Sequence, residues 1–127
     1  MPITMEICQE GRVVYYTGRD PWTLAELSQL FPRDRAHRDS APYKVHVVVD
    51  MRELHTMPSE IFAVRKEKMA NHPNTGHTVI IGANRFARKV VEIILRVANN
   101  DRITFFEDPE QAWTYVAQVI ANETAAS

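Results

Sequence analysis

Hydrophobic residues form short, nearly continuous runs at three places after residue 44. The runs cover residues 45–50, 78–83 and 103–107 and are rich in valine, isoleucine, threonine and phenylalanine. Runs of this length and composition are typical of strands that are covered on both faces, as in a parallel sheet. The sequence therefore predicts three buried strands in this part of the chain.

The N-terminal segment shows two short apolar stretches on either side of a glycine. Residues 4–9 and 12–17 predict two strands joined by a turn at Glu10–Gly11. The glycine can take the positive φ that a tight turn needs. These two strands should pair as an antiparallel hairpin at the edge of the sheet.

Helical periodicity occupies the intervals between the predicted strands. A first helix should follow Asp20 and Pro21 and stop at Pro32, because aspartate is a good N-cap and proline suits the first helical position. A weaker pattern over residues 59–70 predicts a second helix. The segment from Pro32 to Lys44 mixes arginine and aspartate without an apolar period, which predicts a surface loop or, alternatively, a basic arm that binds an anion.

The strongest helical patterns lie in the C-terminal third of the chain. One helix should be capped by Asn84 and the last by Asp108, which Pro109 follows. The predicted apolar stripe of the helix after Asn84 consists of Phe86, Val90, Ile93, Ile94 and Val97.

These elements predict a single α/β domain over residues 1–127 with the order ββαβαβαβα. The sheet should be mixed, because strands that alternate with helices run parallel through right-handed crossovers while the N-terminal pair is antiparallel. The edge strand of the hairpin would be exposed, so a homodimer is one expectation.

Composition narrows the function classes. The chain has 45% hydrophobic and 24% charged residues and a net charge of −1, which argues against a nucleic-acid-binding role. The single cysteine, Cys8, permits no internal disulfide. The N-terminus lacks the pattern of a secretory signal, and no apolar run is long enough for a transmembrane segment. A cytoplasmic protein is the resulting expectation.

Ligands collect at the strand ends in open α/β sheets, where four kinds of chemistry are conceivable for this chain. Asp50 ends a predicted strand, but a phosphoaspartate site also needs clustered acids for Mg²⁺ and a lysine near the last strand, and neither is present. Asp50 should instead bond local backbone. The five histidines are scattered, so no metal site and no cofactor is predicted.

A hydrolase and an anion site are the remaining chemical alternatives. Ser59 follows His55 by four residues, but no orienting acid is evident and no nucleophile-elbow motif occurs, so an enzyme is not predicted. Asn84 and Arg85 at a helix N-terminus are an anion-binding candidate, although a plain capped helix start is the favoured explanation.

Two stretches of the sequence resemble the STAS family, the anti-sigma-factor-antagonist-like domains that include small bacterial regulatory proteins. Residues 50–61, DMRELHTMPSEI, lie over the family loop in which a strand-end Asp leads to a phosphorylated Ser at a helix start. Residues 79–116 resemble the later strand, helix, strand and helix of that family. The resemblance covers most of the chain and makes Ser59 the phosphorylation candidate.

The loop departs from the family pattern around that serine. Pro58 replaces an Asp, Glu60 replaces a second Ser, and Ile61 replaces the following Gly. The resemblance therefore implies a regulatory or protein-interaction domain whose phosphoserine switch is degenerate. The predicted partner-binding residues are Asp50, Met57, Pro58, Glu60 and Phe62.

A second hypothesis comes from a different class of function. Divergent sequences of this kind also resemble lipid-transfer modules, which implies an apolar pocket between the helices and the sheet. The chain would then bind a lipid or another small apolar ligand instead of, or in addition to, a protein partner.

Overall fold

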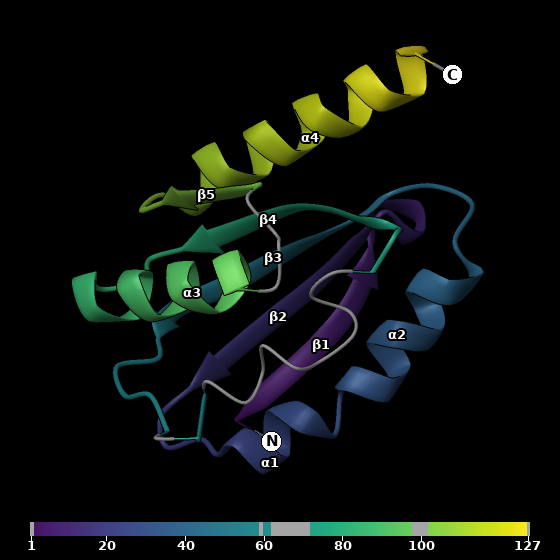
Figure 1. The fold of residues 1–127 in the computed structure, drawn as a ribbon. Helices are drawn as coiled ribbons and strands as arrows, with labels where there is room; N and C mark the ends of the chain where they lie inside the picture. Colours follow the sequence, from purple (N-terminus) through teal and green to yellow (C-terminus); the bar gives the residue numbers. More distant parts are fainter. Residues whose placement is uncertain (1, 59, 62–71, 98–101, 127) are drawn as a thin grey trace.

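Five strands form one mixed sheet with helices on both faces (Figure 1). The computed structural model describes residues 2–58, 60–61, 72–97 and 102–126. In chain order the elements are β1 (Ile3–Cys8), the 3₁₀ turn η1 (Gln9–Gly11), β2 (Val13–Arg19), α1 (Leu24–Ser28), α2 (Phe31–Ser40), β3 (Val45–Glu53), β4 (Thr75–Ile81), α3 (Arg85–Val97), β5 (Ile103–Phe106) and α4 (Pro109–Ala126).

The strands lie side by side in chain order, β1-β2-β3-β4-β5. β1 pairs with β2 in antiparallel orientation, and β2, β3, β4 and β5 are all parallel. The predicted N-terminal hairpin and the predicted parallel strands are therefore confirmed. β3 continues to Glu53 instead of ending at Asp50, so this aspartate lies within the strand.

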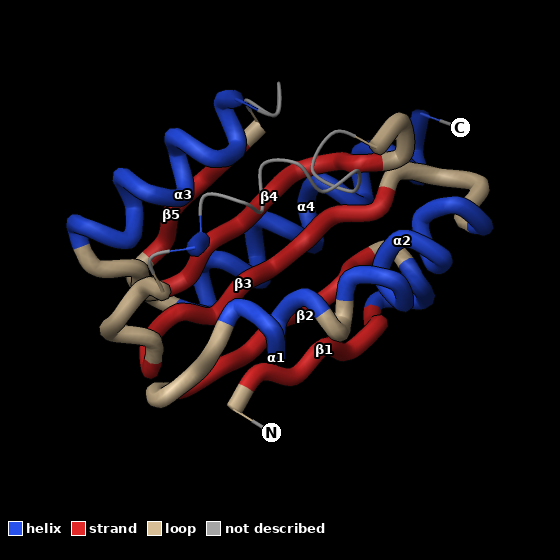
Figure 2. The backbone as a smooth tube through the Cα atoms, turned by 60° about the horizontal axis from the view of Figure 1, so that its bottom comes forward, coloured by secondary structure: helices blue, strands red, loops and turns tan. Residues whose placement is uncertain are grey.

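The helices divide into two layers, one on each face of the sheet (Figures 1 and 2). α1, α2 and α3 cover one face, where Ala87, Val90 and Ile94 of α3 join the buried core. Of the described helices, α4 is the one on the other face, packed through Ala112 and Val116. Side chains alternate between these two cores along each strand because successive strand residues point to opposite faces.

The charged segment after Pro32 is a helix, so the predicted surface loop is wrong. Pro32 lies in the first turn of α2 and does not end the preceding helix. Proline is tolerated there because the N–H groups of the first turn have no partner within the helix. The buried positions of α2 are Phe31, Asp34 and Arg38. Two of its three core-facing residues are charged, which is why no apolar period marked this helix in the sequence.

Of the other predicted helix starts, the first differs from the structure and the last two agree with it. α1 begins at Leu24, since Thr23 and Glu26 form a reciprocal capping box, while Asp20 bonds the loop after β3. Asn84 Oδ1 accepts from the Ala87 N–H at 2.8 Å, and Asp108 Oδ1 accepts from the Glu110 N–H at 3.0 Å. Both predicted caps are therefore confirmed.

The predicted stripe of α3 is correct only in part. Val90 and Ile94 are buried, but Phe86 and Ile93 are 67% and 44% exposed. The buried face is rotated toward Ala87, which is buried together with Val90 and Ile94. The helix predicted over residues 59–70 falls mainly outside the described residues.

No helix in the described part of the chain combines the length and the apolar composition that a bilayer crossing needs.

Candidate functional site

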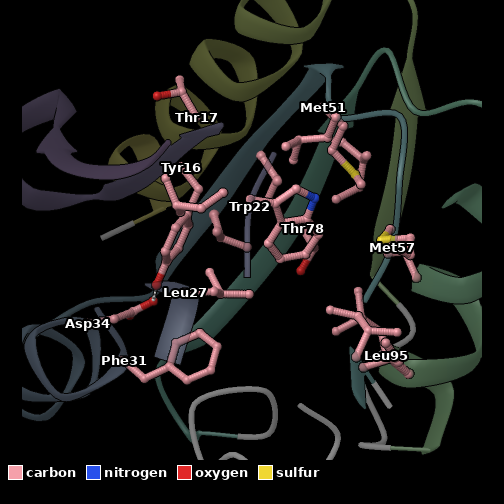
Figure 3. Close-up of a pocket in the computed structure, with 18 of the residues that line it drawn as sticks. Tyr16, Thr17, Trp22, Leu27, Phe31, Asp34, Met51, Met57, Thr78 and Leu95 are labelled. Carbon is pink, nitrogen blue, oxygen red and sulfur yellow. Dashed lines mark hydrogen bonds between the residues drawn. The ribbon is translucent and has the colours of Figure 1, made fainter. Parts of the chain in front are cut away.

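A cavity of about 200 Å³ lies between the sheet and the layer formed by α1, α2 and α3 (Figure 3). Val47 and Val49, in the middle of the central strand, remain half-buried beside it, whereas Val48 on the opposite face is fully buried. An engineered cavity of about 150 Å³ in another protein takes up benzene. The cavity is therefore large enough for a small organic molecule.

The walls of the cavity are mostly apolar and come from almost every element of that face. Figure 3 shows Met51, Met57 and Leu95 on one side, away from Asp34. The Trp22 ring forms another part of the wall, and its Nε1–H donates to the Thr56 carbonyl at 2.9 Å. Because this N–H already has a partner, the ring offers the cavity an apolar surface in a fixed position.

One end of the cavity carries a buried polar cluster formed by Tyr16, Asp34, Arg38 and Thr75. Arg38 Nε donates to Asp34 Oδ1 at 2.6 Å, and the Tyr16 hydroxyl donates to Asp34 Oδ2 at 2.5 Å. Arg38 Nη1 donates to Thr75 Oγ1 at 2.8 Å. The Asp34 and Arg38 residues are 1% and 3% exposed. Burial, together with the Asp34 carboxylate, raises the pKa of Tyr16 far above its usual range.

The cluster ties three elements of the fold together at the cavity. Tyr16 comes from β2, Asp34 and Arg38 from α2, and Thr75 from the start of β4. A buried ion pair needs hydrogen bonds that compensate the loss of water, and these neighbours supply them. The spacing of Asp34 and Arg38 is visible in the sequence, but an i,i+4 pair of this kind is usually a surface pair.

The predicted partner-binding residues that the structure describes do not all lie on one surface. Met57 lines the cavity, whereas Asp50 belongs to the side of β3 that faces away from it and accepts from Tyr15 and Arg52. Pro58 and Glu60 lie in the loop after β3. Ser59 and Phe62 lie outside the described residues.

Asp50 bonds its own backbone neighbourhood, as predicted. Its Oδ1 accepts from the Arg52 N–H at 3.1 Å, and its Oδ2 accepts from Arg52 Nη2 at 2.6 Å. Burial alone would raise the pKa of this carboxyl, but the bonds and charge of Arg52 lower it below the ordinary value. Asp50 is therefore held as an anion by its neighbour two residues on.

The second candidate pair, Asn84 and Arg85, has the geometry of a helix start. Asn84 Oδ1 is engaged by the Ala87 N–H, and its carbonyl accepts from the Arg88 N–H at 2.9 Å. An anion bound at this helix N-terminus would have to compete with Asn84, whose side chain already caps it.

His55 has an acidic neighbour that the sequence did not reveal. Its Nδ1 lies 3.2 Å from Asp20 Oδ2, and its backbone N–H donates to the same oxygen at 2.9 Å. That backbone bond is the main reason why the pKa of Asp20 is lowered. The pair links the loops after β2 and β3, where the Thr56 hydroxyl also donates to Asp20, to its Oδ1 at 3.2 Å. Within the described ranges, no three metal-ligating side chains come together.

A buried histidine on the opposite face of the sheet is a further group that sequence reasoning missed. His46 is 1% exposed, its Nδ1 accepts from the His77 N–H at 2.8 Å, and its Nε2 lies 2.5 Å from Glu123 Oε1 of α4. Burial lowers the pKa of His46, although Glu123 opposes this shift. Burial and Arg102 lower the pKa of His77 in the same way.

These shifts predict a loss of stability toward mildly acidic pH. In the unfolded chain His46 takes up a proton below its ordinary pKa of 6.5, but in the folded protein it resists protonation. Stability is thus fully present above pH 6.5 and decreases as the pH falls below it. Urea unfolding between neutral pH and about pH 5 should show this decrease, and His46→Gln should make the pH dependence shallower. Equal pH dependence in both proteins would contradict the assignment.

Comparison of the chain with models of known protein families and with curated proteins finds no match. The site is therefore interpreted from its geometry alone.

Proposed function

We propose that this protein is a non-catalytic binding domain that holds a small apolar ligand in the cavity between the sheet and α1–α3. The observation that carries the proposal is the cavity itself, about 200 Å³ in volume and lined largely by apolar side chains. Apolar pockets with a few convergent polar groups are the usual form of small-molecule sites. Tightly packed interiors rarely leave such a volume unfilled.

Naphthalene is a suitable probe because it is uncharged, rigid and intrinsically fluorescent. Val49→Phe places a phenyl ring into the cavity from the central strand, at a position where aromatic residues suit the backbone. We expect wild-type protein to bind naphthalene and this variant to bind it at least about tenfold more weakly, a loss of about 1.4 kcal/mol. Fluorescence titration measures both affinities.

Ile7→Phe is the matched control for this experiment. Ile7 lies on β1, is 36% exposed and does not line the cavity, so the control adds the same side chain elsewhere. It should bind naphthalene like the wild type. Equal binding by Val49→Phe and wild type, or no binding by either, would contradict the proposed function.

Protein binding is the second candidate function. The observation in its favour is an exposed apolar pair on α3, Phe86 and Ile93, seven residues apart and so on one side of the helix. Exposed apolar side chains that cluster are frequent at protein interfaces. We propose that a regulatory domain would use this surface together with the loop that contains Met57, Pro58 and Glu60, the loop that the STAS resemblance implies for partner binding. β1 is an edge strand of the sheet, and edge strands can pair with another chain, so a second copy of this protein is one candidate partner.

A separate prediction concerns Ser59, the phosphorylation candidate of the degenerate switch. A phosphate adds a charge of about −1.5 to −2, so Ser59→Asp should weaken binding of a partner that docks on this loop, whereas Ser59→Ala should retain it. A titration of both variants against a partner isolated by pull-down measures the difference. Equal affinities would show that this serine has no part in recognition.

A further inference from the structure

The polar end of the cavity determines what kind of ligand the cavity can accept. Among the described lining residues the only charged groups are Asp34 and Arg38, which lie 2.6 Å apart and compensate each other. Both are nearly fully buried. The described lining therefore presents polar groups but no net charge.

Three hydrogens of this cluster point at acceptors within it. The Tyr16 hydroxyl hydrogen is directed at Asp34 Oδ2, the Arg38 Nε hydrogen at Asp34 Oδ1, and an Arg38 Nη1 hydrogen at Thr75 Oγ1. A ligand carboxylate that accepted one of these three hydrogens would displace a bond of the cluster, and at this end it would also face the charge of Asp34. A ligand ammonium would compete with Arg38 for the same carboxylate. Burying a third charge without a partner is costly in either case.

A ligand hydroxyl meets no such conflict. A phenolic oxygen that donates one hydrogen bond still has lone pairs that can accept, and the Tyr16 side chain lines the cavity with its hydroxyl at the Asp34 end (Figure 3). A ligand O–H can donate to this oxygen while every bond of the cluster remains intact. The rest of the ligand would lie along Leu27, Val49 and Ile94.

We propose that the cavity selects an uncharged apolar alcohol, with its hydroxyl at Tyr16 and its hydrocarbon part against the apolar walls. This inference rests on the proposed function, since it names the ligand class of the same cavity. It excludes ionised fatty acids and amines of equal size. The raised pKa of Tyr16 keeps its hydroxyl protonated, so this selectivity should hold from neutral to moderately alkaline pH.

Three eight-carbon probes separate the alternatives on the wild-type protein at neutral pH. Isothermal titration calorimetry should show 1-octanol binding at least about tenfold more tightly than octanoate or octylammonium. Octanoate or octylammonium binding as tightly as 1-octanol would overturn the inference and leave the proposed function standing. Absence of binding by all three, together with absence of naphthalene binding, would overturn both.

Tyr16→Phe tests the position of the hydroxyl, with naphthalene as the internal control. The variant removes the acceptor but keeps the ring, so 1-octanol affinity should fall by about three- to tenfold, the range of a single hydrogen bond. Naphthalene affinity should stay the same, because naphthalene has no hydroxyl. An equal loss for both ligands, or a loss for neither, would contradict the placement of the alcohol at Tyr16.

Discussion

Replacement of Asp34 with alanine is expected to lower the free energy of unfolding by about 3–5 kcal/mol. The carboxylate accepts from Tyr16 and Arg38 in a site where it is 1% exposed. Its removal takes the charge of Asp34 away from the buried Arg38 guanidinium and the acceptor away from the Tyr16 hydroxyl. Urea unfolding followed by circular dichroism measures the loss.

Two further variants make this prediction specific. Asp39→Ala removes an aspartate from the same helix whose side chain is 63% exposed and pairs with His72; its effect should stay within about 1 kcal/mol. The double variant Asp34→Leu with Arg38→Met removes both charges and should recover most of the stability. If Asp34→Ala were no more harmful than Asp39→Ala, the pair would not be buried as described.

The second large effect is expected at Ile94 in α3. Ile94 is 5% exposed and packs with Met51, Ile80 and Val90 in the core beneath the helices. Ile94→Ala removes buried methyl and methylene groups and should cost about 2–5 kcal/mol, the range for such substitutions in cores. Because Ile94 also lines the cavity, the enlarged space should let the variant accept a bulkier probe than the wild type.

Its neighbour provides a matched control. Ile93→Ala makes the same chemical change at a position that is 44% exposed, and it should change stability by about 0.5 kcal/mol or less. The ratio of the two effects reports which face of α3 is buried. Similar denaturant midpoints for the two variants would mean that the helix is rotated from the orientation described.

Local patterns determined most of the secondary structure. The runs at 45–50, 78–83 and 103–107 identified parallel strands, and Asn84 and Asp108 identified two helix starts. These features can be recognised in the sequence because a buried strand needs continuous apolar residues and a helix start needs a side-chain acceptor within a few positions. Neither requirement depends on distant parts of the chain.

The site was determined only by tertiary structure. Met57 was predicted as a contact for a protein partner, and its place in the cavity wall depends on residues from β1, β2, β3 and α3 that meet only in the folded chain. A cavity is the small space that remains after the helices pack against the sheet, so no local sequence pattern predicts its volume.

The charged helix α2 shows most clearly what each source of information decides. Asp34 and Arg38 are visible in the sequence as an i,i+4 pair, which by itself predicts a solvent-exposed face. Only the arrangement of β2 and β4 beneath the helix brings Tyr16 and Thr75 to this pair and makes its burial possible. The sequence by itself thus determined the strands, their directions and the main helix caps. Tertiary structure decided which charges are buried and where the ligand cavity lies, because burial depends on contacts between residues far apart in the chain.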